Sequence, residues 1–208
     1  NSIYPNYINY SLSEKELVRA KYQMPLDKKI FIYGGNLGKP QGLGFLLETI
    51  SLTKRSDVYF LIVGSGTELV RIKSWFKKNK PKNATLIPIL SKIDYDKLLA
   101  ACDVGLIFLN KNFTIPNYPS RLLSYLEMKM PVITATDENS DIGKDLEKNK
   151  CGFAVLSGDI TEMQNAINRL MNEVNLMNEM KENSWKFLNR DFHVDRSSKL
   201  IMNSINEK

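Results

Sequence analysis

Residues 120–127 carry side chains that could bind a charged ligand. They follow a loop and predict a helix start, with a hydroxyl and an arginine in its first turn. A helix N-terminus favours phosphate, and the guanidinium of Arg121 adds fixed donors for phosphate oxygens. Glu127, further along, could accept hydrogen bonds from sugar hydroxyls. Phosphate at one end and a polyol at the other describe a nucleotide sugar. An ordinary amphipathic helix packed through its leucines would give the same pattern.

The composition is that of a globular protein. The chain has 208 residues, of which 43% are hydrophobic and 25% charged, and no apolar run approaches the ~20 residues needed to span a bilayer. It begins with Asn1 rather than Met and has no visible signal peptide. We therefore expect a fragment of a cytoplasmic protein. Cys102 and Cys151 are far apart and predict free thiols in a reducing compartment.

The net charge of +6 is concentrated in part in residues 77–82. This run fits either a solvated helix end or a peripheral contact with an anionic membrane. It lacks the aromatic residues typical of RNA-binding patterns, so we expect no nucleic-acid partner. His193 is the single histidine, which argues against a histidine-based metal site or triad. Asp94 and Asp96 are typical of a helix start, so we expect no metal site there.

Strands and helices alternate along most of the chain. Short apolar runs predict strands at residues 29–33, 58–63, 84–87, 104–108, 132–135 and 152–155. Helical patterns predict helices at residues 43–54, 68–78, 95–102, 120–128, 142–149 and 160–174. Continuous apolar strands separated by helices favour an α/β fold with a parallel sheet covered on both faces. Right-handed crossovers make this six-stranded sheet doubly wound, or Rossmann-like.

We divide the chain into three parts. Residues 1–27 are a lead-in with an extended segment and a short helix capped by Ser13, residues 28–174 are the sheet domain, and residues 175–208 form two C-terminal helices. Ligands of such sheets bind outside the carboxyl ends of the strands. The loops at that edge are residues 34–42, 64–66, 88–92, 110–120 and 136–140. The first two are rich in glycine, and the long loop of residues 110–120 leads directly into Ser120 and Arg121.

Four motifs resemble, in order, those of the C-terminal donor-binding domain of a GT-B glycosyltransferase of the retaining family 4. Residues 3–9 (IYPNYIN) resemble its interdomain linker, residues 31–42 (FIYGGNLGKPQG) its glycine loop, and residues 61–68 (LIVGSGTE) its V-G-x-G-x-E turn. Residues 98–103 and 119–133 resemble the sequence through its donor-site helix, closest to members with P-S-K-L-x-E-Y-L. The resemblance covers essentially the whole chain and implies one half of a GT-B fold.

The resemblance implies a role for each motif. Arg121 would be the catalytic residue that stabilises the leaving diphosphate, and Glu127 would bind the ribose. The diphosphate-binding positions implied are Gly34, Gly35, Asn36, Lys39, Gln41, Ser120 and Arg121, and the nucleobase-binding positions are Ile89 and Leu90.

Three positions depart from the family pattern. Asn36 and Gln41 stand where the glycine loop usually has Arg and Lys, and Pro119 takes the place of the first acid of a Glu-x7-Glu motif whose second acid would be Glu127. Two positive charges are thus absent from the expected diphosphate site, while Lys39 and Arg121 remain.

The resemblance implies a metal-independent enzyme that transfers sugar from a nucleotide-diphosphate donor, a UDP-sugar in the simplest case, with retention of configuration. The implied acceptor is a growing surface polysaccharide or a lipid-linked saccharide, bound between this domain and a preceding N-terminal Rossmann-like domain. The fragment alone would turn over little. Two alternatives stay open: an enzyme like the nonhydrolysing UDP-sugar 2-epimerases, and a non-catalytic nucleotide-binding or interaction module.

Overall fold

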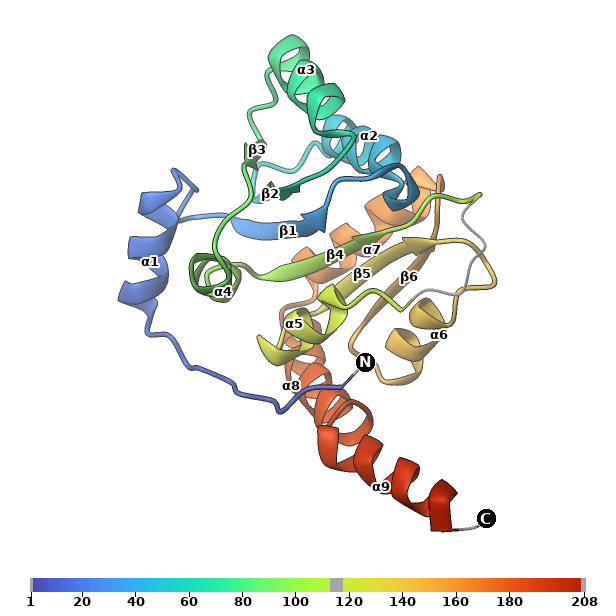
Figure 1. Cartoon of the computed structure of the whole chain (residues 1–208). Helices are drawn as coiled ribbons and strands as arrows, with labels where there is room; N and C mark the ends of the chain where they lie inside the picture. Colours follow the sequence, from blue (N-terminus) through green and yellow to red (C-terminus); the bar gives the residue numbers. More distant parts are fainter. Residues whose placement is uncertain (1, 113–117, 207–208) are drawn as a thin grey trace.

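The computed structural model describes residues 2–112 and 118–206 and has the α/β fold expected from the sequence (Figure 1). Six parallel strands form one sheet in the order β3-β2-β1-β4-β5-β6. They are β1 (Lys29–Asn36), β2 (Val58–Ser65), β3 (Ala84–Ile87), β4 (Val104–Phe108), β5 (Val132–Thr136) and β6 (Gly152–Leu156). Strand order therefore reverses between β1 and β4, which is the switch point of a doubly wound sheet.

Helices cover both faces of this sheet. One face packs against α2 (Leu43–Leu52), α3 (Leu69–Asn79) and α7 (Ile160–Asn172). The other face packs against α4 (Lys92–Ala100), α5 (Arg121–Glu127) and α6 (Asp141–Lys148). The long helix α8 (Val174–Asp191) contacts both α7 and α5, and α9 (Val194–Asn206) follows it.

The apolar strands form because both of their faces are buried. In β1, Ile30 and Ile32 pack with the helices of one face, whereas Phe31 and Tyr33 pack with those of the other. All four side chains are fully buried. Burying such a side chain favours folding by about 1.5–3 kcal/mol. A continuous apolar run, rather than an alternating one, is therefore what this position in the sheet requires.

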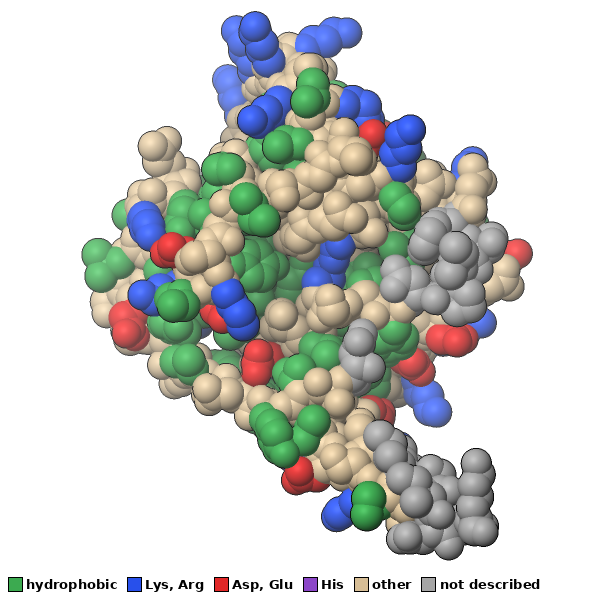
Figure 2. Space-filling model, viewed as in Figure 1, with side chains coloured by type: hydrophobic (Ala, Val, Ile, Leu, Met, Phe, Trp, Pro, Cys, Tyr) green, Lys and Arg blue, Asp and Glu red, His purple; other side chains and the backbone are tan. Residues whose placement is uncertain are grey.

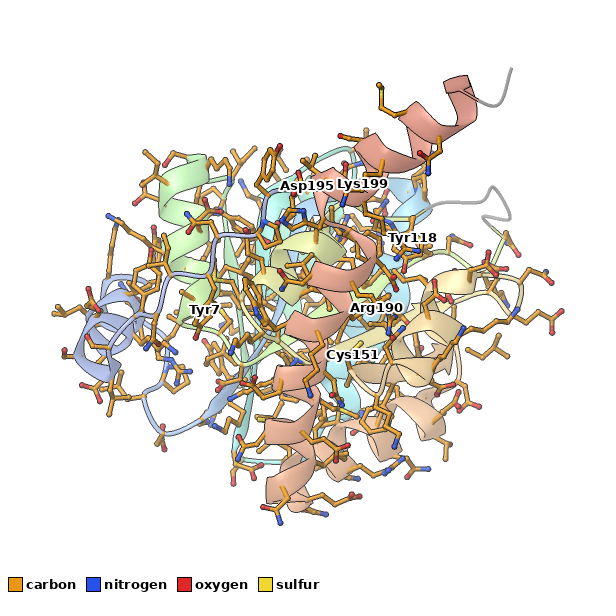
Figure 3. All side chains as sticks on the ribbon, turned by 90° about the horizontal axis from the view of Figure 1, so that it is seen from below. Tyr7, Tyr118, Cys151, Arg190, Asp195 and Lys199 are labelled. Atoms are coloured by element: carbon orange, nitrogen blue, oxygen red, sulfur yellow. The ribbon has the colours of Figure 1, made fainter. Side chains whose placement is uncertain are left out.

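The lead-in segment packs along the C-terminal helices. The backbone of Ile3 forms hydrogen bonds with Phe192 and Val194, and the Tyr7 ring lies 5.8 Å from that of Trp185 on α8. Figure 3 shows Tyr7 on the segment that crosses this side of the molecule. The segment that resembles an interdomain linker therefore has a fixed course over the domain.

The cap of α1 (Leu12–Lys21) differs from the one expected. Ser11, not Ser13, is the N-cap, and it forms a capping box with Glu14. In this box the Ser11 hydroxyl accepts the Glu14 N–H and the Glu14 carboxylate accepts the Ser11 N–H. The S-x-x-E spacing of residues 11–14 is the signature of this cap, so the sequence did contain the signal.

Both cysteines are free thiols, as expected. Cys102 follows α4 and is half-buried, and Cys151 precedes β6 and is buried. Burial raises the pKa of the Cys151 thiol to about 12. A thiol with so high a pKa is unreactive, so Cys151 has a packing role.

Candidate functional site

A cavity of about 720 Å³ opens at the carboxyl edge of the sheet, beside the switch point between β1 and β4. Its volume is in the range of small-molecule sites. The wall comes from the ends of β1 and β2, the loop after β3, and the first turns of α4 and α5. The residues that line it are Gly34, Gly35, Asn36, Val63, Gly64, Ser65, Ile89, Leu90, Lys92, Tyr95, Asp96, Ser120, Arg121 and Ser124.

The backbone itself forms part of the wall, because two glycines allow close approach. Gly64 has a φ of +152°, and a Cβ there would overlap the carbonyl oxygen of Gly35. A Cβ on Gly34 would overlap the hydroxyl of Tyr95. Larger residues at these two positions would displace β1, β2 or α4. Glycine at these two positions therefore lets β1, β2 and α4 approach one another closely at the edge of the cavity.

Arg121 begins α5 and lies in the cavity wall. Its Nη2 donates to Oε1 of Gln41 over 2.7 Å, and its Cζ lies 4.5 Å from the centre of the Tyr33 ring. Its Nη1 is buried and has no hydrogen-bond partner, and among the described residues it is the one buried side-chain N or O atom in that state. An unpaired buried donor on a charged group is costly. A negatively charged ligand oxygen that reached Nη1 would remove this cost.

Tyr125 lies one turn after Arg121 and ties α5 to the sheet. Its hydroxyl accepts the N–H of Gly34 at 3.1 Å and lies 3.3 Å from one carbonyl oxygen of β1 and one of β4. Gly105 makes room for the ring, because a Cβ there would overlap it. Burial raises the pKa of Tyr125 to about 12, although the charge of Arg121 opposes the shift. The hydroxyl is thus protonated at neutral pH and holds the end of β1 beside the cavity.

Ser120 precedes α5 and leaves its hydroxyl free of a capping role. Its backbone is helical, with φ −59° and ψ −26°, and its side chain makes no capping hydrogen bond. The residue is exposed and lines the cavity. A ligand can therefore reach the hydroxyl without competing with the helix. In the loop of residues 110–120 that leads to this helix, residues 113–117 lie outside the described residues.

Most of the residues predicted from the sequence lie together in the cavity wall: Gly34, Gly35, Asn36, Ser120, Arg121, Ile89 and Leu90. Two residues of the glycine loop do not line it. Lys39 is exposed on the short 3-10 helix Lys39–Gln41. Gln41 is buried, and its side chain bonds to Arg121 instead of facing the cavity.

Glu127 lies outside the cavity wall, in contrast to the expected ribose contact. Its Oε1 accepts the backbone N–H of Asn6 at 2.9 Å. Ser124, on the same helix, lines the cavity in its place. An α-helix turns by about 100° per residue, so Ser124 lies about 60° around α5 from Arg121 and Glu127 about 120°. The helical angle explains why Ser124 shares the cavity-facing side with Arg121.

Three cavity residues on α4 did not emerge from the sequence. The sequence pattern placed the start of this helix at Tyr95, but α4 begins at Lys92, and its N-cap Ser91 accepts the N–H of Asp94. The earlier start brings Lys92, Tyr95 and Asp96 onto one side of the helix. Nζ of Lys92 donates to Asp96 over 2.8 Å, and burial raises the pKa of the Tyr95 hydroxyl. The cavity thus gains an ion pair at its rim and a protonated hydroxyl beside Gly34.

Two kinds of feature are absent from the described residues. No group of three or more His, Cys, Asp and Glu side chains there could hold a metal ion. No helix in the same part of the chain combines the length and the apolar character that crossing a membrane would require.

Comparison with known proteins identifies the family. The family model of the glycosyl transferases group 1 matches residues 14–187. The chain belongs to this family. The match includes every strand of the sheet and all the residues that line the cavity.

Two curated members of the group 1 family are similar to the chain at low identity. WcaI of Escherichia coli K12, named for colanic acid biosynthesis, is 24% identical over 132 residues, which cover 64% of this chain and 32% of WcaI. WbjE of Pseudomonas aeruginosa, named as a glycosyltransferase, is 23% identical over 147 residues, which cover 71% of this chain and 36% of WbjE. The chain thus matches about a third of the length of each relative.

Solved glycosyltransferases share the fold of the whole chain. HepE of Anabaena, crystallised with UDP, aligns with a TM-score of 0.83 at 16% identity and covers 100% of this chain and 56% of HepE. WaaG, a glycosyltransferase involved in lipopolysaccharide biosynthesis, aligns with a TM-score of 0.69 at 16% identity over 96% of this chain and 54% of WaaG. This chain, a member of the group 1 family, therefore corresponds to the C-terminal half of a GT-B structure.

Proposed function

We propose that this chain is the donor-binding half of a retaining glycosyltransferase that takes its sugar from a UDP-sugar. The observation that carries the proposal is the unpaired Nη1 of Arg121, a residue that lines a cavity at the switch point of the sheet. A diphosphate oxygen supplies the partner that Nη1 lacks. The likeness to HepE, which was crystallised with UDP and with UDP-glucose, supports UDP as the nucleotide.

Arg121 acts on the leaving group in this proposal. During transfer, the bond between the anomeric carbon and the β-phosphate oxygen breaks, and its electron pair passes to that oxygen. The acceptor hydroxyl bonds to the same carbon and passes its proton to the departing phosphate oxygen. Because negative charge grows on the diphosphate, a guanidinium already in place stabilises the transition state more than the ground state. Removing one such preorganised donor costs about 2.7–4 kcal/mol in other enzymes.

The other wall residues divide by chemistry. We assign the backbone of Gly34 and Gly35, together with the hydroxyl of Ser120, to the diphosphate. We assign Ile89 and Leu90 to the nucleobase, since Ile89 offers an apolar side chain that is 68% exposed at the cavity. The side chains of Asn36 and Lys39 are exposed near the same end of β1 and can add donors to the phosphates.

The ribose assignment has two candidates, which one experiment separates. Glu127 is the residue that the sequence predicts, and Ser124 is the residue on α5 that lines the cavity. Affinity for UDP should fall in Ser124→Ala if the ribose contacts the wall of α5, and in Glu127→Gln if the carboxylate leaves the Asn6 N–H to bind the sugar. Whichever of the two variants lowers the affinity for UDP should leave the affinity for 2′-deoxy-UDP unchanged, because that ligand lacks the hydroxyl in question.

The acceptor and the second half of the enzyme follow from the relatives. We infer that the acceptor is a surface polysaccharide or a lipid-linked saccharide, because WcaI and WaaG are named for such pathways. We infer that it binds against an N-terminal Rossmann-like domain, because the chain covers 56% of HepE and 54% of WaaG. In this arrangement the donor site is complete in the chain, and the acceptor site is not.

Isothermal titration of the 208-residue chain with UDP, GDP, ADP and uridine tests the proposal. We expect UDP to bind, uridine to bind more weakly because it lacks phosphates, and GDP and ADP to bind more weakly than UDP. Binding should be equal in Mg²⁺ and in EDTA, since the expected site uses no metal. A chain that binds none of the three diphosphates at millimolar concentration would contradict the proposal.

A further inference from the structure

We propose that Gln41 and Tyr33 form a neutral clamp that positions Arg121 and leaves its full positive charge for the diphosphate. The term neutral clamp refers to these two side chains alone. The proposal rests on the function proposed above and adds two positioning residues that do not themselves line the cavity.

The geometry of the clamp holds the guanidinium from two directions. Oε1 of Gln41 accepts from Nη2 of Arg121 at 2.7 Å and from the Tyr33 hydroxyl at 3.1 Å. The Tyr33 ring lies under the guanidinium, with its centre 4.5 Å from Cζ. Tyr33 is fully buried and Gln41 is 9% exposed, so water competes little with either contact. Nη1 is the guanidinium nitrogen that the clamp leaves without a partner.

Neither member of the clamp carries a formal charge. An amide oxygen and the face of an aromatic ring both attract a cation without neutralising it. Burial raises the pKa of the Tyr33 hydroxyl, against the opposing charge of Arg121, so the hydroxyl does not ionise near neutral pH. A carboxylate in the place of Gln41 would hold the guanidinium equally well, but it would form an ion pair and compete with the phosphates.

The clamp gives a reason for the departure from the family pattern at Gln41. Gln41 stands where the resembling glycine loops have a cation, and a lysine at that position would place a second positive charge against Nη2 of Arg121. With glutamine there, the same position supplies an acceptor. Of the cations expected at the diphosphate site, the chain thus keeps the clamped Arg121 and the exposed Lys39.

Two substitutions of Gln41 separate positioning from folding. Gln41→Glu keeps the size and the acceptor but adds a negative charge, so it should preserve thermal stability and weaken UDP binding about tenfold or more. Gln41→Met keeps the size without the acceptor, so it should lower stability and weaken UDP binding. Uridine, which has no phosphate, should bind Gln41→Glu as it binds the wild type. Tyr33→Phe, which keeps the ring and loses the hydroxyl, should weaken UDP binding less than Gln41→Glu.

The results that overturn the clamp are distinct from those that overturn the proposed function. Wild-type chain that binds no nucleoside diphosphate contradicts the function itself. If the wild type binds UDP and Gln41→Glu binds it equally well, Arg121 does not depend on a neutral neighbour and the clamp is wrong. If Gln41→Glu weakens the binding of uridine and of UDP to the same degree, Gln41 shapes the whole cavity. The proposal that Gln41 positions Arg121 is then wrong.

The charge distribution points to a second, independent surface, which we propose binds anionic lipid membranes. Residues 69–93 contain seven Lys and Arg and no Asp or Glu, whereas the rest of the chain contains 22 Lys and Arg and 23 Asp and Glu. The α3 basic surface consists of five exposed lysines on this helix and just after it: Lys73, Lys77, Lys78, Lys80 and Lys82. None of the five forms an ion pair with a described residue.

The shape and composition of the α3 basic surface favour a membrane over a nucleic acid. The helix stands out at one end of the molecule (Figure 1), and the positive side chains gather there in the space-filling view (Figure 2). The aromatic residues of α3, Trp75 and Phe76, pack against the core and are not available to stack on bases. A protruding basic end can meet a planar anionic bilayer, where each lysine near the surface contributes about 1 kcal/mol.

Vesicle co-sedimentation tests this surface. The chain should bind vesicles of phosphatidylcholine with phosphatidylglycerol at low salt and dissociate from them at high salt. It should not bind vesicles of phosphatidylcholine alone. Substituting glutamine for Lys77, Lys78, Lys80 and Lys82 should abolish this binding. The matched control, glutamine at four exposed lysines elsewhere with the same charge change, should retain it: Lys144, Lys148, Lys150 and Lys186. Equal loss in both variants, no vesicle binding at low salt, or binding to single-stranded RNA without binding to vesicles would overturn the proposal.

Discussion

The two ends of the junction between β1 and β4 each carry an arginine, and the two are held in opposite ways. At the amino end, Arg19 donates through Nη2 to the carboxylate of Asp103 at 2.8 Å, and through Nε and Nη1 to the carbonyl oxygens of Ala101 and Lys28. At the carboxyl end, Arg121 has a neutral amide, an aromatic ring and a nitrogen with no partner. Each nitrogen of the Arg19 guanidinium thus has a hydrogen-bond partner, whereas Nη1 of Arg121 has none.

The difference matches a structural use of Arg19 and the ligand-binding use that we propose for Arg121. Asp103 also accepts the N–H of Ile30, so the ion pair at the amino end joins α1 to both strands. At the carboxyl end the same joining role falls to the uncharged hydroxyl of Tyr125. Backbone pairing between β1 and β4 is limited to Phe31 with Val104 and Ile32 with Gly105. Side chains therefore reinforce the short ladder at both ends, and of the two arginines it is Arg121, beside the cavity, that keeps a nitrogen without a partner.

The largest effect should come from Arg19→Met. The Arg19 and Asp103 side chains are each 13% exposed, and removing Arg19 leaves the carboxylate with Lys29 Nζ, 3.4 Å away and half exposed, as its remaining counter-charge. We therefore expect the free energy of unfolding to fall by about 3 kcal/mol, the lower end of the range for a broken buried ion pair. Urea denaturation followed by circular dichroism measures it, and any folded fraction should still bind UDP normally. A loss below about 1 kcal/mol would place Arg19 among ordinary surface residues.

A smaller loss of stability should follow Tyr125→Phe. The variant removes the acceptor for the buried N–H of Gly34 and keeps the ring that packs over Gly105. An unsatisfied buried donor costs about 1–3 kcal/mol, less than a broken buried ion pair. In the same denaturation experiment, the free energy of unfolding of Tyr125→Phe should therefore lie between those of the wild type and of Arg19→Met. A cost equal to that of Arg19→Met would mean that the two ends of the junction are tied equally strongly.

The third effect on stability is confined to alkaline pH. The pKa of Tyr125 is about 12 in the folded chain, and an unfolded tyrosine has a pKa of about 10. The folded state thus keeps a proton that the unfolded state releases, so this contribution to stability is complete below pH ~10 and is lost as pH rises towards ~12. Urea denaturation from neutral to alkaline pH should show the decline, and Tyr125→Phe should show a shallower one. Parallel curves for the two proteins would assign the decline to other groups.

The sequence predicts the sheet well, because a strand that is buried on both faces has to be a continuous apolar run. Each strand is a short apolar run, and the loops at the carboxyl edge follow from the strand ends, which locates Ser120 and Arg121 beside the glycine loop. The capping box of Ser11 and Glu14 and the helical angle between Arg121 and Ser124 were also available from spacing alone. These features depend on residues close in sequence.

The contacts that give the cavity its electrostatics depend on residues far apart in sequence. Gln41 and Arg121 are 80 positions apart, and Tyr125 and Gly34 are 91 apart. No local pattern shows that a glutamine in one loop accepts from an arginine that begins a later helix. For the same reason, the sequence suggested Gln41 as a phosphate ligand, whereas its side chain bonds to Arg121.

The most direct test compares the free energies of binding of UDP and of uridine to wild type and to Arg121→Met, measured by isothermal titration under one set of conditions. The difference between the binding free energies of UDP and of uridine gives the contribution of the diphosphate. It should shrink by about 1.5–3 kcal/mol in the variant, the usual range for hydrogen bonds to a charged group, while the free energy of unfolding changes little. An unchanged difference between UDP and uridine would show that the unpaired guanidinium does not hold the diphosphate.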